Sequence, residues 1–128
     1  LVGSSLGGFY ATWLAQKWNA PAVVINPAVR PDLSLRSHAG WQTHYVTGER
    51  VLVRPEYFEQ LTRYRVSAPE PDRFWLLCAQ DDEVLDSGEM VSHYVGSKQT
   101  VTRTGGHTFA DFAQYIPDIL AFGAQHAR

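Results

Sequence analysis

The sequence contains one cysteine, Cys78, among its 128 residues. A single cysteine forms no disulfide within the chain and cannot build a cysteine-based metal site alone. An unpaired thiol is typical of proteins in a reducing compartment, so we expect a cytoplasmic location.

Long apolar runs and clusters of basic residues are absent as well. No stretch approaches the ~18 consecutive apolar residues that a membrane-spanning helix requires. The formal net charge is −2 and the Lys and Arg residues are scattered, which argues against a nucleic-acid partner. With 45% apolar and 19% charged residues, the composition is that of one globular domain. It favours a small-molecule ligand and leaves the oligomeric state open.

The sequence also has no initiator Met, and Leu1 and Val2 lead directly into a motif. We therefore interpret residues 1–128 as the C-terminal portion of a single domain, with its N-terminal strands missing from this chain.

The hydrophobic pattern alternates between strands and helices. It predicts strands ending near residue 3 and spanning residues 22–25, 74–79 and 99–103, with helices at 6–19, from Ser87 onward, and after an interruption at Pro117. This alternation predicts an α/β fold whose mostly parallel sheet carries helices on both faces. Residues 31–67 are irregular and polar, with one helix predicted over 55–64, and we interpret them as a cap-like insertion.

Two helix faces are expected to be buried against this sheet. Ser87 is the predicted N-cap of the first of these helices. The apolar residues assigned to the two faces are Met90, Val91, Tyr94 and Val95, followed by Phe112, Ile116, Ile119 and Leu120.

The segment Gly3-Ser4-Ser5-Leu6-Gly7 has the Gly-x-Ser-x-Gly pattern of a nucleophile elbow. In this motif the serine lies at a strained turn between a strand and a helix, and its hydroxyl projects above the sheet. We expect both outer glycines to be required where a Cβ would collide with neighbouring backbone, and Gly8 to give room at the helix start. Ser5 is the candidate nucleophile, and the Leu6 N–H, at the helix N-terminus, is a candidate oxyanion donor.

Acidic residues and a histidine follow the two later predicted strands. A serine nucleophile needs a base to take its proton and an acid to orient that base. In an α/β-hydrolase the chain order is serine, acid, histidine. Asp82 follows the strand at 74–79 and His107 follows the strand at 99–103, at the sheet edge where catalytic residues collect. We predict His107 as the base, while chain order and position leave Asp81, Asp82 and Glu83 competing for the role of the acid.

Other kinds of site fail on spacing. No His-x3-His pair or clustered His and Asp pattern occurs, so no metal ion is expected. The glycine-rich turn lacks the Lys of a phosphate-binding loop and the Gly-x-Gly start of a dinucleotide fingerprint. The remaining histidines are interpreted as surface or structural residues: His38, His44, His93 and His126.

Aromatic residues of the insertion could line an acyl pocket, but core packing is the commoner role at such spacings. We therefore leave them outside the predicted site: Trp41, Tyr45, Tyr57, Phe58 and Tyr64.

Four separated segments together resemble the YqiA-type bacterial esterases: VGSSLGGFYATWL at 2–14, NPAVRP at 26–31, DEVLD at 82–86 and GGH at 105–107. The resemblance extends along nearly the whole chain. It implies an α/β-hydrolase fold, no cofactor, and hydrolysis of carboxylic esters or of acyl-thioesters such as acyl-CoA. It also implies Ser5 as nucleophile, His107 as base and Asp82 as acid, because Asp82 precedes the turn at 83–86 as the acid of this family does; Asp81 is the alternative acid.

The chain departs from this family in two places. Family members carry, ahead of the elbow, a strand and a His-Gly-Phe loop that supplies a second oxyanion donor, and nothing in this chain corresponds to it. Loss of one such donor typically lowers turnover ~10²–10³-fold, so we expect the 128-residue chain alone to be weak or inactive. Asp81 stands where a glycine is usual.

The fold and the predicted triad do not fix the leaving group or the acceptor. Acyltransferase, lipase and C–C hydrolase chemistry therefore remain alternatives to ester hydrolysis. A non-catalytic binding module that retains the elbow as a packing turn is a further alternative.

Overall fold

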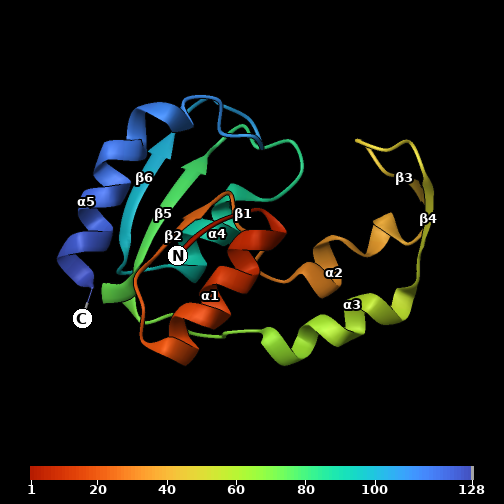
Figure 1. Cartoon of the computed structure of the whole chain (residues 1–128), viewed down its shortest axis with the longest axis horizontal. Helices are drawn as coiled ribbons and strands as arrows, with labels where there is room; N and C mark the ends of the chain where they lie inside the picture. The colour runs from red at the N-terminus through yellow and green to blue at the C-terminus, as the bar shows by residue number, and fades with distance from the viewer. Residues whose placement is uncertain (128) are drawn as a thin grey trace.

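Four parallel strands form the main sheet of the computed structural model, which describes residues 1–127. They lie in the order β1-β2-β5-β6 (Figure 1). Their bounds are Val2–Ser4 for β1, Ala22–Ile25 for β2, Phe74–Ala79 for β5 and Lys98–Thr102 for β6. The predicted parallel α/β fold is confirmed, and β6 is shifted by one residue, spanning 98–102 rather than 99–103.

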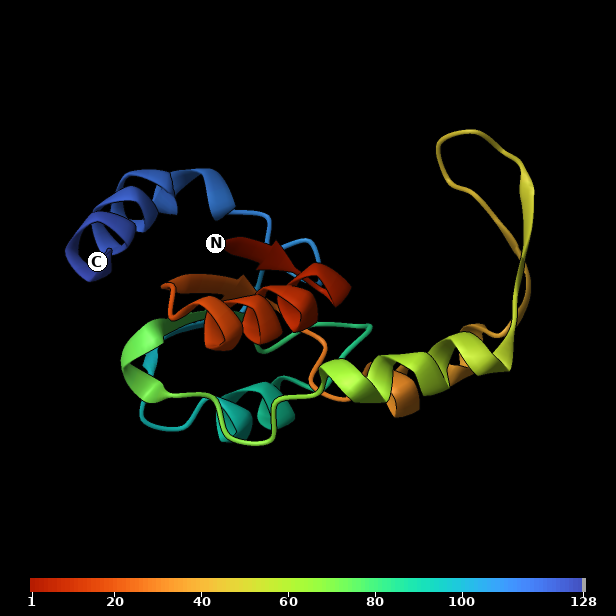
Figure 2. The ribbon, with the colours of Figure 1, turned by 60° about the horizontal axis from the view of Figure 1, so that its bottom comes forward.

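Helices cover both faces of this sheet, as predicted (Figure 2). α1 (Leu6–Trp18) and α4 (Ser87–His93) lie on one face, and α5 (Ile116–His126) lies on the other. β5 is central to the core because all of its residues are buried. Its alternate side chains join the two halves of the core: Phe74, Leu76 and Cys78 beneath α1 and α4, and Trp75, Leu77 and Ala79 beneath α5.

Local chemistry explains where the helices begin and end. Asn19 closes α1 with a left-handed φ of 53°. Pro117 lies in the first turn of α5, directly after the 3₁₀ turn Phe112–Tyr115, as the predicted interruption requires. The predicted cap of α4 is wrong by one residue, because the Asp86 carboxylate, rather than Ser87, accepts the first free N–H groups of that helix.

The buried faces of α4 and α5 are narrower than predicted. Each helix is short and contacts the sheet along one side, so only some of its apolar residues reach the core. The residues buried as predicted are Met90, Tyr94 and Ile119, with Phe112 partly buried, whereas Val91, Val95, Ile116 and Leu120 are exposed.

Residues 31–67, which we call the arm, leave the sheet after β2 and return before β5. The arm contains α2 (Pro31–Ser34), a hairpin of β3 (Gly40–Thr43) and β4 (Arg50–Val53), and α3 (Pro55–Leu61). Figure 2 shows the hairpin extending away from the main sheet. The prediction of an irregular segment is wrong here, because β3 and β4 pair in antiparallel register around a turn at Gly48, whose φ is 73°. The predicted helix over 55–64 ends at Leu61 and continues as the 3₁₀ turn Thr62–Tyr64.

Within residues 1–127, every helix is too short or too polar to cross a bilayer.

Candidate active site

Ser5 lies at a strained bend between β1 and α1, with φ 55° and ψ −123°. A positive φ is rare for a residue with a side chain and indicates that the surroundings hold the bend. The end of β2 supplies this support. The Ser5 N–H donates to the Ile25 carbonyl at 3.0 Å, and the Ser5 carbonyl accepts the Ala28 N–H at 2.9 Å.

Two of the three glycines at the elbow allow close packing. A Cβ on Gly3 would collide with the Gly7 carbonyl one turn into α1, and a Cβ on Gly8 would lie 2.7 Å from the Cβ of Pro27. The expectation for Gly7 is wrong, because a Cβ there would meet no atom within 4 Å. Glycine is therefore required at Gly3, where β1 faces α1, and at Gly8, where α1 faces Pro27, but not at Gly7.

The His107 ring bridges the Ser5 hydroxyl and the Asp82 carboxylate. Its Nε2 lies 2.9 Å from Ser5 Oγ, and its Nδ1 lies 2.9 Å from Asp82 Oδ2. The three residues come from the loops that follow β1, β5 and β6. Because parallel strands present their C-terminal ends at one edge of a sheet, residues 102 positions apart in the chain are brought into hydrogen-bond contact.

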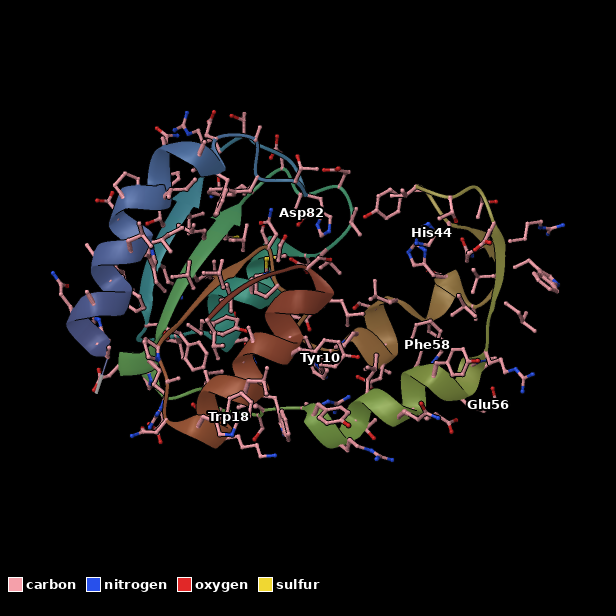
Figure 3. All side chains as sticks on the ribbon, viewed as in Figure 1. Tyr10, Trp18, His44, Glu56, Phe58 and Asp82 are labelled. Carbon is pink, nitrogen blue, oxygen red and sulfur yellow. The ribbon has the colours of Figure 1, made fainter. Side chains whose placement is uncertain are left out.

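Backbone hydrogen bonds fix the Asp82 carboxylate independently of its contact with the imidazole. Its Oδ1 accepts the N–H groups of Val84 at 2.8 Å and Leu85 at 2.9 Å, and its side chain is fully buried. Figure 3 shows Asp82 in the loop that follows β5. Asp81, the alternative acid, instead accepts the N–H of Gly106 at 2.8 Å. Of the two carboxylates, only Asp82 contacts the ring of His107.

A second potential nucleophile lies close to this site but is suppressed. Cys78 is fully buried in β5. Burial, and to a smaller extent the negative charge of Asp82, raises the pKa of its thiol to about 11. Since the thiolate is the reactive form of cysteine, the site has a hydroxyl rather than a thiol available for attack at neutral pH.

The candidate oxyanion donor lies at the first position of α1. As the first helical residue, Leu6 has no acceptor within the helix for its N–H. The amide directly follows Ser5, and it lies at the positive end of the helix dipole.

Sequence reasoning missed the contacts of two polar residues at this site, Asn26 and Glu83. Asn26 is fully buried at the end of β2, and its amide donates to the carbonyls of Gly106 and His107. Glu83 accepts the His107 N–H at 3.0 Å. Asn26 precedes a proline after a buried strand, which reads as a strand end, and Glu83 reads as a solvated charge; neither pattern carries a signal for these contacts.

The other histidines lie away from the triad. His38, His44 and His126 are exposed, and Figure 3 shows His44 on the hairpin of the arm. His93 is half-buried on α4, where burial lowers its pKa. No group of three or more His, Cys, Asp or Glu side chains within residues 1–127 is arranged to hold a metal ion.

The aromatic residues of the arm divide between surface and interior. Trp41 and Tyr45 on the hairpin are 60% and 95% exposed and Tyr57 on α3 is 46% exposed, so the prediction of core packing is wrong for these three. Phe58 is buried, and Tyr57, Phe58 and Tyr64 line a cavity of about 910 Å³ between α1 and α3. Figure 3 shows Tyr10 of α1 and Phe58 of α3 in this region. Leu6, next to Ser5, also lines the cavity.

Comparison with known proteins places this chain in a family. The model of the uncharacterised protein family UPF0227 matches residues 1–124. Among solved structures, the chain is similar to one named "Putative hydrolase" from Agrobacterium vitis S4, with a TM-score of 0.70 and 19% identity over 96% of this chain and 60% of that one. It is also similar to the esterase domain of a Rhodothermus marinus protein, with a TM-score of 0.63 and 13% identity over 98% of this chain and 59% of that one.

At these identities the likeness shows a shared fold. The chain spans about 60% of the length of each of these two structures.

Proposed function

The chain belongs to the uncharacterised protein family UPF0227, the YqiA family, and on that premise we propose that it is a serine hydrolase of carboxylic esters or acyl-thioesters. One observation carries the proposal. The His107 ring lies 2.9 Å from both Ser5 Oγ and Asp82 Oδ2, with Ser5 held at a strained bend. A serine hydroxyl needs such a base, and the base needs a carboxylate to fix its tautomer.

In the proposed reaction, Nε2 of His107 takes the proton of Ser5 as Oγ attacks the acyl carbonyl carbon. The Asp82 carboxylate accepts the Nδ1–H and stabilises the imidazolium. The imidazolium then gives its proton to the departing alcohol or thiol, which leaves an acyl group on Ser5. Water then gives a proton to Nε2 of His107 as it attacks the carbonyl carbon of this ester. The imidazolium returns that proton to Ser5 Oγ as the bond from Oγ to the acyl carbon breaks, which releases the carboxylic acid.

The Leu6 N–H is the proposed donor to the oxyanion that forms on attack. It is the one donor that we assign within residues 1–127. A covalent label reports a single event at each serine, so we expect acylation of Ser5 to be easier to detect than steady-state turnover.

The cavity of about 910 Å³ beside Leu6 supports an apolar acyl group as the part of the substrate that binds. Aromatic and aliphatic side chains of α1 and α3 line it, including Tyr10, Trp13, Phe58 and Leu61. Pockets of this size and character bind apolar ligands by burial of their surface.

Labelling with a serine-directed fluorophosphonate tests the nucleophile. We expect the wild-type chain to be labelled and Ser5→Ala to be unlabelled. Ser4→Ala is the matched control, because Ser4 is exposed and directly precedes the nucleophile; it should be labelled like the wild type. Labelling that survives Ser5→Ala would refute the assignment, and absence of labelling in the wild-type chain would favour a non-catalytic binding module.

A substrate panel tests the chemistry. Esters, thioesters and amides of one acyl group, with and without an added alcohol acceptor, separate hydrolysis from acyl transfer, and a β-diketone separates it from C–C cleavage. For the acyl site, Gln60→Trp should reduce the preference for octanoyl over acetyl esters, because Gln60 lines the cavity. Glu59→Trp is the control, since Glu59 is an exposed neighbour outside the cavity lining. Equal effects of the two variants would place the acyl group elsewhere.

A further inference from the structure

The loop that carries His107 contains two consecutive glycines. Two hydrogen bonds within it, each 3.1 Å long, join the Ala110 N–H to the Gly105 carbonyl and the Phe109 N–H to the Gly106 carbonyl. Gly105 and Gly106 have φ values of 129° and 66°, conformations that glycine adopts readily and other residues avoid. Glycine in a loop also has the largest conformational freedom to lose. We therefore expect contacts from outside the loop to add to these two hydrogen bonds in fixing the position of the His107 ring.

Asn26 supplies contacts to the carbonyls of this loop. Its Nδ2 donates to the carbonyl of Gly106 at 2.9 Å and to that of His107 at 3.0 Å. Its Oδ1 accepts the N–H of Ala79, the last residue of β5, at 2.9 Å. This side chain is fully buried, so both donors and its acceptor are used where water cannot replace them.

Two carboxylates supply contacts to the amides of the same loop. Asp81 Oδ1 accepts the N–H of Gly106 at 2.8 Å, and Glu83 Oε2 accepts the N–H of His107 at 3.0 Å. Both residues flank Asp82, which contacts the ring of His107. The turn after β5 therefore hydrogen-bonds the ring of His107 and the two consecutive amides of Gly106 and His107.

The position of Asn26 ties these contacts to the nucleophile. Its neighbour Ile25 accepts the Ser5 N–H, and Ala28 donates to the Ser5 carbonyl. The end of β2 therefore touches the backbone of Ser5, the end of β5 and the loop of His107.

We propose that Asn26, Asp81 and Glu83 are positioning residues, which hold the backbone of residues 105–107 so that the His107 ring reaches Ser5. This inference rests on the proposed function. Displacement of a reacting group by about 1 Å can lower the rate ~10²-fold without changing substrate contacts. All four of their hydrogen bonds to this loop go to backbone atoms of Gly106 and His107, so their proposed effect on the His107 ring passes through the backbone.

Asn26→Asp is the sharpest variant, because it keeps the size of the side chain and the acceptor for Ala79 but loses both N–H donors. We expect the rate of fluorophosphonate labelling, and the kcat for an activated ester, to fall about 100-fold with KM within about threefold of wild type. The introduced carboxyl regains one donor when it is protonated, so the ratio of variant to wild-type rate should rise as pH is lowered. Asn19→Asp is the control. Both asparagines have a left-handed backbone, with a φ of 40° at Asn26 and 53° at Asn19, but Asn19 is exposed at the end of α1.

The two carboxylates allow the hydrogen bond to be separated from the charge. Glu83→Gln and Asp81→Asn retain an oxygen acceptor, and we expect rates within about threefold of wild type. The double variant Asp81→Ala/Glu83→Ala loses both acceptors, and we expect a fall of about tenfold or more with little change in Tm, because both residues are exposed. If Asn26→Asp fails to fold, this double variant decides the question.

Hydrogen exchange gives a readout that is independent of catalysis. The amides of Gly106 and His107 should be protected in the wild-type chain and should exchange at least tenfold faster in the double alanine variant. Wild-type rates in folded Asn26→Asp and in the double variant would overturn the inference, and so would equal exchange of these amides in both chains. If the wild-type chain is not labelled, the proposed function fails, and the exchange result still shows whether the loop is held.

Discussion

The two sheets of the molecule use their side chains in opposite ways. In β5 all six residues are buried, because helices cover both faces of the parallel sheet. In the hairpin of the arm, Trp41 is 60% exposed and Tyr45 95% exposed, and every residue of its two strands except Gly40 and Val53 is exposed. The residues of the candidate site follow strands of the buried sheet. The contrast shows that the site is positioned by a sheet buried on both faces, while the hairpin depends on the backbone pairing of β3 with β4.

We expect the largest effect from a glycine substitution at the elbow, in the sheet that is buried on both faces. Gly3→Val puts a side chain against the Gly7 carbonyl at the junction of β1 and α1. The Gly7 backbone can move away from this side chain only if α1 separates from β1. We therefore expect loss of the folded state, measured by near-ultraviolet circular dichroism. Gly7→Ala is the matched control and should stabilise α1 by about 0.5–1 kcal/mol, since nothing lies within 4 Å of a Cβ there. A folded Gly3→Val chain would contradict the packing described for the elbow.

A pair of leucines gives the next largest effect. Leu76 of β5 is fully buried, and Leu52 of β4 is 38% exposed. We expect Leu76→Ala to lower the free energy of unfolding by about 2–5 kcal/mol and Leu52→Ala to change it by no more than about 0.5 kcal/mol. Urea denaturation measures both. Similar losses for the two variants would mean that the hairpin is packed as tightly as the sheet.

Thiol chemistry compares solvent access in the same two regions. The buried Cys78, whose pKa is raised to about 11, should react with iodoacetamide at pH 8 only as the chain unfolds. The cysteine of Val46→Cys, in the chain Cys78→Ala, should react at once, because Val46 is 71% exposed at the hairpin tip. Mass spectrometry of the native and urea-treated chains gives the two rates. Rapid alkylation of Cys78 in the native chain would contradict the burial of β5.

The raised pKa of Cys78 also predicts a direction for stability against pH. The folded state favours the neutral thiol, so its contribution is complete below the unfolded pKa of about 8.5. It is lost as pH rises from there toward about 11. The wild-type chain should therefore lose more unfolding free energy than Cys78→Ala between pH 8.5 and 11, and parallel curves would contradict this.

The smallest expected effect lies where the arm returns to the sheet. His93 of α4 lines a cavity with residues 65–71, and burial lowers its pKa from 6.5, the nearby Glu89 opposing this shift. A lowered pKa means that the folded state favours neutral His93, so its contribution to stability is present above pH 6.5 and is lost as pH falls. Between pH 7 and 5 the wild-type Tm should fall slightly further than that of His93→Gln. An identical fall would show that His93 is solvated in the folded chain.

The same contrast explains what the sequence could predict. β2 and β5 were predictable to the residue, because strands buried on both faces form continuous apolar runs. The hairpin of the arm was not, because neither of its faces is buried and no alternation of apolar and polar residues results. Residue type, chain order and position after strands made Ser5 and His107 candidates, but they left three neighbouring carboxylates open for the acid.

The contacts of Asn26 and Glu83 could not be found in this way. Their partners are backbone groups about 80 and 24 residues away in the chain, and any residue type provides such groups. The role of these two side chains exists only in the folded arrangement. As neighbours of Asp82, Asp81 and Glu83 were candidates for the acid, but for contact with the ring of His107 rather than with the amides of Gly106 and His107.

The distance of 102 residues between Ser5 and His107 has a consequence for biosynthesis. A ribosome makes Ser5 near the start of this segment and His107 near its end, and the two meet only after β6 has joined the sheet. Under the proposed mechanism, a growing polypeptide carries a serine that is chemically inert. The serine then becomes nucleophilic only when the His107 ring reaches Ser5 Oγ in the folded domain.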